Sequence, residues 1–308
     1  MATMQHRSVM LEEAVDALDV RPQGLYVDCT FGRGGHSRFI LQRLTEGGEL
    51  LGIDKDPQAV ATGEELADSD GRFHIRRGSF ADLTEMVSSL GWQGVDGILM
   101  DLGVSSPQLD DAARGFSFLR DGPLDMRMDP EVGEGAAEWL RRAKEADIAR
   151  VLKTYGDERY SRRIAAAIVA ENRVSEIVTT AHLADVISKA HPSWEKGKHP
   201  ATRSFQAIRI HINKELDDLN SGLMQTVELL KTGGRLAVIS FHSLEDRMVK
   251  RFMRAQSRGD AIPKGVPVTA DQLNCRMRLV GGAVMPSEEE VSANPRARSA
   301  VLRVAEKL

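Results

Sequence analysis

The stretch VDCTFGRGGHS, residues 27–37, constrains the fold more than any other part of the chain. It closes an apolar run with Asp28, passes through a turn with three glycines and opens a helical pattern. Glycine lets the backbone turn tightly and lets a ligand approach it closely. The following helix offers unpaired N–H groups and a partial positive charge, which suit a phosphate or a carboxylate. The stretch therefore predicts the first strand, turn and helix of a ligand-binding sheet.

Strand and helix patterns alternate through the first third of the chain. The segments that favour strands cover residues 24–28, 49–54, 72–78 and 95–101, followed much later by 233–241, 275–280 and 300–305. A helical pattern covers 37–44, and another begins after Asp56, with this residue as its N-cap and Pro57 at its first position. This rhythm predicts a doubly wound α/β fold, with a parallel sheet covered by helices on both faces.

The alternation stops after residue 106. Residues 107–130 are rich in Gly, Pro and Asp, and residues 134–190 carry only helical patterns. From Phe205 to Leu223 apolar residues recur every three or four positions, which indicates a helical core stripe. We therefore expect a discontinuous sheet domain, residues 1–106 and 200–308, interrupted by an inserted helical domain, residues 107–199.

The composition limits where the protein is expected to be located and which disulfide or metal sites it is expected to contain. No apolar run is long enough to span a bilayer, and the N-terminus lacks the apolar core of a signal peptide. Cys29 and Cys275 lie too far apart in sequence to form a CxxC metal site, and no disulfide framework can be read from two cysteines. The histidines show no His-x-x-x-His spacing, so no metal site is expected. A reducing cytoplasm is the expected location.

Two basic runs stand out against the net charge of −4. Neither contains an acid. The first comprises Lys196, Lys198, Arg203, Arg209 and Lys214, and the second comprises Arg247, Lys250, Arg251, Arg254 and Arg258. Each run alone is typical of a solvated helix face, but two such runs in an acidic protein also favour a polyanionic partner.

Two acids and a serine distinguish between the ligands that the glycine turn could bind. Asp54 ends the second strand 26 residues after Asp28, where an acid can accept both hydroxyls of a ribose. That arrangement fits a dinucleotide or S-adenosylmethionine. Ser37 stands where the pattern G-x-G-x-x-G would place its third glycine, and Asp28 would repel a pyrophosphate but suit an α-amino group. The turn therefore favours S-adenosylmethionine, with a purely structural tight turn as the alternative.

The segment DLGVSSPQL, residues 101–109, follows the fourth strand, where the sheet should face the reactive end of the cofactor. Amino-group methyltransferases carry an [Asp/Asn/Ser]-Pro-Pro-aromatic motif at this point. Residues 105–108 are similar but depart from the motif at Ser106 and Gln108.

Several longer stretches together resemble the MraW (RsmH) family from about residue 6 to the C-terminus. They are TFGRGGHS (30–37), DLGVSSPQLD (101–110), RGFSF (114–118), DMRMD (125–129), HPATRSFQAIR (199–209), SFHSLEDR (240–247) and NPRARS (294–299). This resemblance implies a class I methyltransferase (Rossmann-like) fold and transfer of a methyl group from S-adenosylmethionine. The implied substrate is the cytosine N4 amine of a decoding-region cytidine in 16S ribosomal RNA of the small subunit.

The resemblance also implies roles for particular residues. The methionine end of the cofactor would contact Gly34, Gly35 and His36, the ribose would contact Asp54, the adenine would contact Phe80, and the pocket beyond the fourth strand would be lined by Asp101 and Gln108. Residues 107–199 would form the substrate-recognition domain.

The N4 lone pair of cytosine is delocalised into its ring, so the chemistry needs hydrogen-bond acceptors on the amine. Such acceptors turn the nitrogen toward sp³ and stabilise the developing positive charge. Asp101 is our first candidate, helped by a hydroxyl or backbone carbonyl of Ser105 or Ser106. Because position 108 is not aromatic, the target base must stack elsewhere, and the candidates are Phe116, Phe118, Phe205 and Phe241.

Three other functions stay open on the sequence. One is an NAD-dependent oxidoreductase, against which Asp28 and Ser37 count. A second is a methyltransferase that acts on another amine, in DNA or protein. A third is a non-catalytic RNA-binding assembly factor with a relict cofactor pocket.

Overall fold

The computed structural model describes residues 8–193, 197, 199–259 and 274–308. The chain divides into two compact units, which are described separately below. The sheet unit comprises residues 1–103 and 217–308, and the helical unit comprises residues 104–216. The sequence analysis placed these boundaries at 106/107 and 199/200, so residues 200–216 were assigned to the wrong side. Helix α10 (Thr202–Asn213) belongs to the helical unit because its buried face, including Phe205 and Ile208, packs into the core of that unit.

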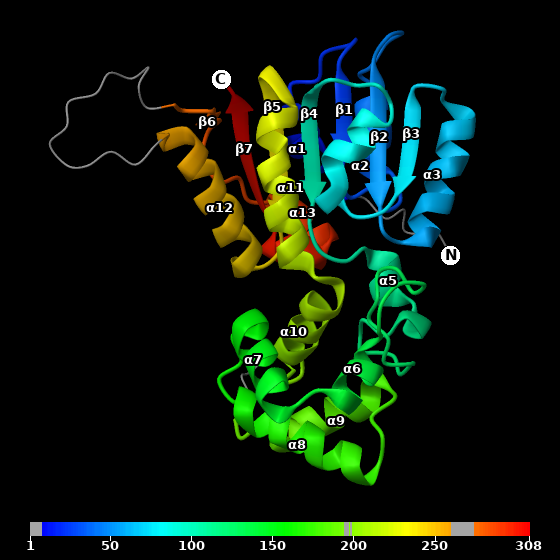
Figure 1. Ribbon diagram of the computed structural model, residues 1–308, viewed down its shortest axis with the longest axis vertical. Coiled ribbons are helices and arrows are strands. Elements are labelled where there is room, and N and C mark those ends of the chain that lie inside the picture. The colour runs from blue at the N-terminus through cyan, green and yellow to red at the C-terminus, as the bar shows by residue number, and fades with distance from the viewer. Residues whose placement is uncertain (1–7, 194–196, 198, 260–273) are drawn as a thin grey trace, which may run out of the picture. The chain divides into compact units, whose positions relative to one another are not determined.

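Seven strands form one sheet in the sheet unit (Figure 1). They are β1 (Leu25–Asp28), β2 (Glu49–Asp54), β3 (Phe73–Arg77), β4 (Val95–Asp101), β5 (Leu230–Ser240), β6 (Met277–Leu279) and β7 (Val301–Lys307). The strand order is β3-β2-β1-β4-β5-β7-β6, in which the first five are parallel and β7 runs antiparallel to both neighbours. The order reverses between β1 and β4, the position at which doubly wound sheets bind ligands. The predicted class I methyltransferase (Rossmann-like) fold is confirmed.

The central strands form where the sequence is apolar on both faces. Every residue of β4 except its last, Asp101, is buried. Tyr26 of β1 is also fully buried, and its ring lies over Gly97 of β4, where an added Cβ would come within 2.7 Å of a ring carbon. Glycine at position 97 therefore makes room for the tyrosine. This dense packing holds the carboxyl ends of β1 and β4 side by side, with Asp28 paired to Leu99.

Helices of the sheet unit are α1 (Leu11–Ala17), α2 (Gly35–Leu41), α3 (Pro57–Ser69), α4 (Leu83–Ser88), α12 (Ser243–Arg258), α13 (Glu288–Ala293) and most of α11 (Glu215–Leu229). The start of α3 agrees with the sequence analysis. The Asp56 carboxylate accepts a hydrogen bond from the Gln58 N–H at 3.0 Å, and Pro57 occupies the first helical turn. The N-cap prediction is therefore confirmed.

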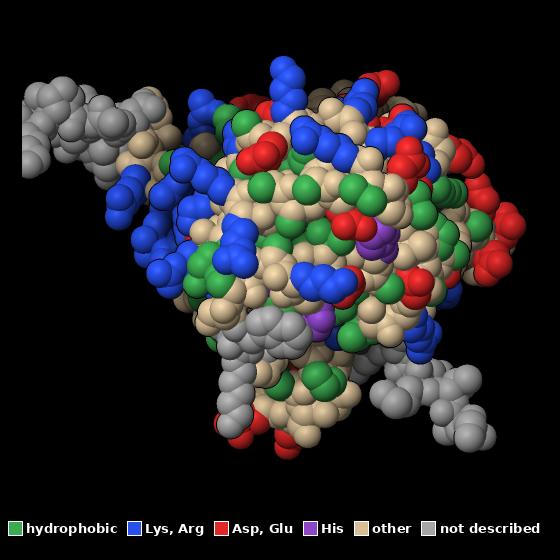
Figure 2. Space-filling view, turned by 90° about the horizontal axis from the view of Figure 1, so that it is seen from below, with side chains coloured by type: hydrophobic (Ala, Val, Ile, Leu, Met, Phe, Trp, Pro, Cys, Tyr) green, Lys and Arg blue, Asp and Glu red, His purple; other side chains and the backbone are tan. Residues whose placement is uncertain are grey.

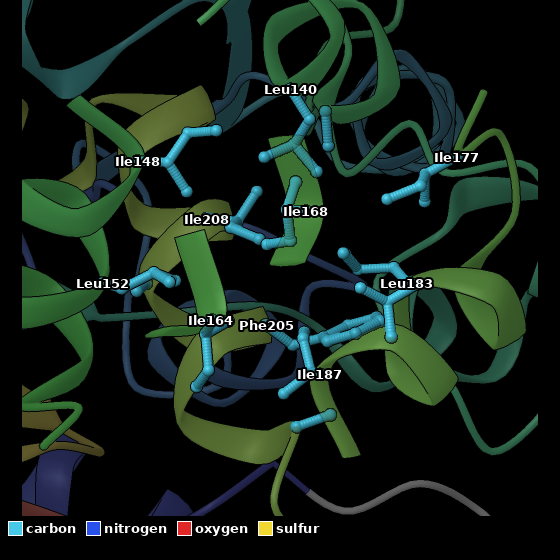
Figure 3. Packing of buried hydrophobic residues seen from close by; sticks show 14 of the residues in the cluster. Leu140, Ile148, Leu152, Ile164, Ile168, Ile177, Leu183, Ile187, Phe205 and Ile208 are labelled. Carbon is cyan, nitrogen blue, oxygen red and sulfur yellow. The ribbon is translucent and has the colours of Figure 1, made fainter. Parts of the chain in front are cut away.

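The helical unit has a core of its own. Its helices are α5 (Ser106–Asp110), α6 (Ala136–Arg142), α7 (Glu145–Gly156), α8 (Ser161–Val174), α9 (Thr180–Ala190) and α10. Figure 3 shows how Ile148, Ile164, Leu183 and Phe205 point toward one another from four of these helices. Fully burying one such side chain stabilises the fold by about 1.5–3 kcal/mol. Phe205 is only 4% exposed, so the sequence-based suggestion that it stacks on a base gives way to its core position.

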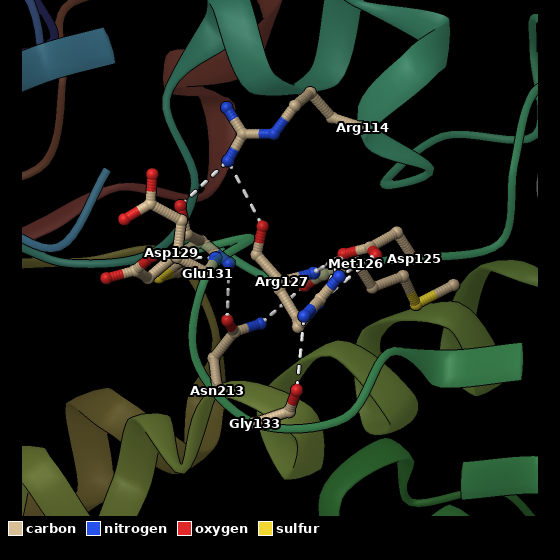
Figure 4. Close-up of polar contacts among 9 residues, drawn as sticks. Arg114, Asp125, Met126, Arg127, Asp129, Glu131, Gly133 and Asn213 are labelled. Atoms are coloured by element: carbon tan, nitrogen blue, oxygen red, sulfur yellow. Dashed lines mark hydrogen bonds and ion pairs between the residues drawn. The ribbon is translucent and has the colours of Figure 1, made fainter. Parts of the chain in front are cut away.

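A polar network fixes the long loop that follows α5 (Figure 4). The Arg127 guanidinium pairs with the Asp125 carboxylate at 2.6 Å. Arg114 donates to the carbonyl oxygens of Arg127 and Met128 at 3.1 and 2.8 Å. The Asn213 side-chain oxygen accepts from the Met128 N–H at 2.7 Å. These bonds satisfy the loop backbone and attach it to the end of α10.

Candidate active site

Three aspartates end neighbouring strands at one edge of the sheet. Asp28 is the last residue of β1, Asp54 of β2 and Asp101 of β4. Since β1 pairs with both other strands in parallel, their carboxyl ends meet at this edge. The glycine turn between β1 and α2 lies at the same edge. Three carboxylates so close together raise one another's pKa unless donors or cations compensate them.

Asp28 turns inward and holds the glycine turn. Its side chain is fully buried, and its oxygens accept hydrogen bonds from the Ser37 hydroxyl at 2.7 Å and the Thr30 N–H at 3.2 Å. Burial raises the pKa of Asp28, while His36 and Ser37 act in the opposite direction. The expectation that Asp28 faces the amino group of a ligand is therefore not met. Ser37 replaces the third glycine because its hydroxyl is needed here, a role that the glycine pattern alone does not reveal.

Asp54 joins the end of β2 to the glycine turn. Its two oxygens accept hydrogen bonds from the backbone N–H groups of Gly32 at 2.7 Å and Asp56 at 2.9 Å. Burial raises the pKa of Asp54 to about 6, and the two N–H donors only partly offset this effect. Each carboxylate oxygen has a second lone pair. The side chain can therefore still accept hydrogen bonds from ligand hydroxyls.

Asp101 has an unmet hydrogen-bonding capacity. Its Oδ1 atom is buried and has no hydrogen-bond partner among the described residues, while Oδ2 lies 3.8 Å from Nδ1 of His36. Burial raises the pKa of Asp101 well above its usual range, and the carboxylates of Asp28 and Glu245 raise it further. A buried polar atom without a partner is rare in folded proteins, and a catalytic role is one of the explanations for it.

His36 is held beside Asp101 by the segment that precedes α1. Its Nε2 lies 3.1 Å from the Val9 carbonyl oxygen, which is a hydrogen bond when this nitrogen carries the proton. Nδ1 is then an acceptor that faces Asp101. Burial lowers the pKa of His36, which favours this neutral form.

The two remaining glycines of the turn have steric reasons to be glycine. Gly34 has a φ of 75°, and an added Cβ would come within 2.8 Å of the Phe31 ring. A Cβ on Gly35 would lie 2.0 Å from the Ser8 hydroxyl oxygen. The turn is therefore packed from both sides, by Phe31 and by the chain before α1. Substitution at either glycine would displace the backbone that a ligand approaches.

Phe80 lies beyond the end of β3, at the start of the short helix η1 (Phe80–Asp82). The end of β3 lies beside the end of β2 here, and the Asp54 carbonyl oxygen accepts the Gly78 N–H at 2.9 Å. One side of the ring packs on Gly222 of α11, where an added Cβ would approach it to 2.8 Å. The ring is half-buried, so part of it stays accessible next to the Asp54 end of β2.

Ser105, Ser106 and Gln108 belong to the helical unit, whereas Asp101 belongs to the sheet unit. Ser105 is the N-cap of α5, and its N–H donates to Oε1 of Gln108 at 2.9 Å. The Gln108 N–H in turn donates to the Ser105 hydroxyl at 3.5 Å. This is a capping box, which explains why position 108 is not aromatic. Ser106 and Gln108 are 8% and 5% exposed.

A second capping box, which the sequence analysis missed, starts α12. The Glu245 carboxylate accepts the N–H groups of Phe241 and His242 at 2.9 and 3.3 Å, and Nδ1 of His242 accepts the Glu245 N–H at 3.4 Å. Glu245 is 2% exposed. The sequence did not indicate this capping box because histidine rarely serves as an N-cap. The box anchors the turn after β5 and brings a carboxylate near enough to raise the pKa of Asp101.

The described residues include no group of three or more His, Cys, Asp or Glu side chains placed to hold a metal ion. Within the same residues, none of the helices combines the length and the apolar character that crossing a membrane requires. The site therefore consists of carboxylates, a histidine, a half-buried phenylalanine ring and backbone N–H groups.

Comparisons with known proteins cover the whole chain. A model of the MraW methylase family matches residues 3–308. The "Ribosomal RNA small subunit methyltransferase H" of Chromohalobacter salexigens is 58% identical over 309 aligned residues, which cover 100% of this chain and 93% of that protein.

Two solved structures show weaker likenesses. An rRNA methylase from Streptococcus thermophilus has a TM-score of 0.42 at 11% identity, covering 100% of this chain and 99% of that one. TrmN from Thermus thermophilus has a TM-score of 0.43 at 14% identity, covering 97% of this chain and 48% of that one. Both TM-scores lie below 0.5, so the fold assignment rests on the strand order described above.

Proposed function

Because the chain belongs to the MraW methylase family, we propose that it methylates the N4 amine of a decoding-region cytidine in 16S ribosomal RNA. The methyl donor is S-adenosylmethionine. The name of the 58% identical relative supports a small-subunit ribosomal RNA substrate. We further propose that the enzyme acts in the cytoplasm, on RNA of the small ribosomal subunit, and that the helical unit recognises this RNA.

One observation carries the proposal: Asp101 Oδ1 is buried, with no hydrogen-bond partner among the residues that the structure describes, at the edge of the sheet where the glycine turn lies. S-adenosylmethionine supplies an electrophilic methyl group on a positively charged sulfur. The residues present fit such a ligand. Asp54 has lone pairs for ribose hydroxyls, Phe80 has an accessible ring area for the adenine, and the turn at Gly34 and Gly35 would adjoin the methionine end.

In this proposal Asp101 controls the amine. An N–H group of the cytosine amine donates to Oδ1 of Asp101, which replaces the missing hydrogen bond and favours the ionised carboxylate. The nitrogen lone pair would thereby be released toward the electrophilic methyl group that bound S-adenosylmethionine would supply. The amine proton becomes acidic only after methylation, so a weak acceptor is sufficient. His36 Nδ1 lies 3.8 Å from the other carboxylate oxygen and, with the proton on Nε2, forms no hydrogen bond to it; we propose that His36, with Gly34 and Gly35, adjoins the methionine end.

Ser105 and Ser106 stay proposed acceptors for the second N–H of the amine. The Ser105 hydroxyl already accepts the Gln108 N–H, and its carbonyl oxygen accepts the Leu109 N–H at 3.2 Å. Both groups are therefore part of the frame of α5. Ser106 is the better candidate of the two, and Gln108 contributes by supporting the turn.

The proposal is tested by transferring a labelled methyl group to 16S RNA and to assembled small subunits, followed by nucleoside analysis. We expect the label in N4-methylcytidine. Label in another nucleoside, in DNA or in protein would contradict the proposed substrate while leaving the enzyme a methyltransferase. Transfer to naked RNA and to subunits, measured side by side, identifies the form of the substrate.

A further inference from the structure

Helix α12 carries a row of cations on its outer face. Arg247, Arg251, Arg254 and Arg258 are exposed and follow one another at positions i, i+4, i+7 and i+11, so they lie on one side of the helix. Lys250 lies beside this row and is half-buried. We call the four arginines the α12 stripe. It extends about 16 Å along the helix axis.

The opposite face of α12 is used inside the protein. Val249 and Met253 are fully buried, and α12 packs against β5, β6 and β7. The apolar side of the helix is therefore not available to enter a lipid surface. The stripe is instead a charged outer face on a rigid element of the sheet unit, which suits a ligand that binds through charge alone.

Among the described residues, no acid compensates the stripe. Both acids of α12 are engaged elsewhere, because Glu245 caps the helix and Asp246 pairs with Arg303 of β7 at 2.7 Å. None of the four stripe arginines forms a side-chain hydrogen bond or ion pair with another described residue. Figure 2 shows Lys and Arg side chains gathered at its left, the side on which Figure 1 places α12.

Several arginines on other elements of the sheet unit, unlike those of the α12 stripe, form ion pairs with acids. Arg43 pairs with Asp16, Arg72 pairs with Asp70 at 2.6 Å, and Arg278 pairs with Glu306 at 2.7 Å. In the stripe, by contrast, like charges stand three or four residues apart, a spacing at which they repel each other. An anionic partner would remove this repulsion.

The other basic run does not offer a comparable surface. Lys196 and Lys198 lie outside the described residues. Arg209 is held by Glu215 through two hydrogen bonds of 2.8 Å, so its charge is compensated within the helical unit. The α12 stripe is therefore the stronger candidate of the two runs.

The stripe begins close to the candidate active site. Helix α12 starts three residues after the end of β5, and Ile239 of β5 pairs with Asp101 of β4. From that edge of the sheet the stripe leads away along the helix. A strand whose target base lies at Asp101 could thus continue along α12 with its phosphates against the arginines.

We propose that the α12 stripe binds the phosphates of single-stranded RNA next to the target nucleotide. This inference rests on the proposed function, since it takes the RNA substrate from there. Contacts of this kind carry no sequence information, but they position the strand and make its affinity depend on salt. The stripe arginines are therefore positioning residues, and they leave the chemical step unchanged.

The test compares Arg251→Gln/Arg254→Gln with a matched control, Arg43→Gln/Arg278→Gln, which removes two compensated arginines from the same unit. Binding of a fluorescent 16S RNA fragment is measured by anisotropy at several KCl concentrations. Each lost phosphate contact on a single strand should reduce the slope of log affinity against log salt by about 0.7, so the stripe variant should lose about 1.4. The control should keep the wild-type slope.

Steady-state methyl transfer gives a second readout. The stripe variant should raise KM for RNA and leave kcat at saturating RNA and the affinity for S-adenosylmethionine unchanged. Thermal unfolding of all variants checks that each is folded, and Arg247→Gln alone provides a milder version with half the slope change. These readouts separate strand positioning from chemistry.

Three outcomes would overturn the inference: equal slopes in the stripe variant and the control, a fall in kcat without a change in slope, or an equal loss of affinity for polyglutamate. The last result would indicate a general polyanion surface. If the wild type binds RNA with a slope that depends on the stripe but transfers no methyl group to it, the inference stands and the proposed function fails. The two ideas are thus tested separately.

Discussion

Two of the polar clusters described above differ in one respect. In the helical unit, Arg114, Arg127 and Asn213 are matched to carbonyl oxygens, an N–H group and the Asp125 carboxylate. At the edge of the sheet, Asp101 lacks a hydrogen-bond partner for Oδ1 within the described part of the chain. A satisfied network makes the fold specific, whereas an unsatisfied group costs stability and is kept where a ligand completes it. The difference indicates which cluster is structural and which is functional.

The largest effect should come from Asp101→Asn, which keeps the size of the side chain and removes its charge. We expect methyl transfer to fall by about 10²–10³-fold, because the variant loses an electrostatic contact that strengthens in the transition state. Label transfer under single-turnover conditions measures this loss, and Asp68→Asn on the exposed face of α3 serves as the control. Full activity in the Asp101 variant would remove Asp101 from the catalytic group.

The same residue predicts a pH dependence. Because the pKa of Asp101 is raised, transfer by the wild type should increase with pH as the carboxyl group loses its proton. The Asp101→Asn variant should not show this increase. A pH profile that is identical in the two proteins would assign the titration to another group.

Asp54 allows a test through stability. Its pKa is raised from about 3.8 to about 6, so between these values the folded chain keeps a proton that the unfolded chain has lost. Stability therefore falls as pH rises through this interval, by at most about 3 kcal/mol. The Asp54→Asn variant lacks this titratable group, so it should not lose this stability. The difference in free energy of unfolding between the variant and the wild type should therefore rise by this amount from pH 4 to pH 8. Urea unfolding at both pH values measures it, and a constant difference would disprove the pKa shift.

A substitution in the polar cluster of the helical unit should reduce stability and leave cofactor binding unchanged. Asn213→Ala leaves the Met128 N–H and the Met126 carbonyl oxygen without their 2.7 Å partners, so we expect a loss of about 1–3 kcal/mol in the free energy of unfolding. Affinity for S-adenosylmethionine should not change. Urea unfolding and calorimetric titration measure the two quantities. A loss of cofactor affinity at full stability would erase the contrast between the clusters.

Much of the sheet could be predicted because its signals are local. Apolar runs marked the strands, and Asp56 with Pro57 marked the start of α3. The direction of β7 could not be predicted, because strand pairing depends on contacts distant in sequence. The boundary near residue 200 was misplaced for a related reason. The apolar stripe of α10 shows that one face is buried, but not in which core.

The site was predicted in its residue types but not in its contacts. The role of Asp28 was misjudged because a buried partner, Ser37, comes nine residues later on another element. The sequence Ser105-x-x-Gln108 is a recognisable capping box, so this signal was present and was interpreted as a degenerate motif. The missing partner of Asp101 could not be predicted, since the absence of a contact is a property of the folded chain alone.

The position of β7 has a consequence for damaged copies of the protein. Every residue of the candidate site precedes residue 250, yet the strand that pairs with the second edge of β5 is Val301–Lys307. A copy shortened by a premature stop codon or a protease before that strand would retain all of its proposed catalytic groups. It would also expose a long, apolar edge ready to pair with another chain. Such a copy should be lost through aggregation and degradation. A separately supplied peptide corresponding to β7 should cover the exposed edge of β5 again.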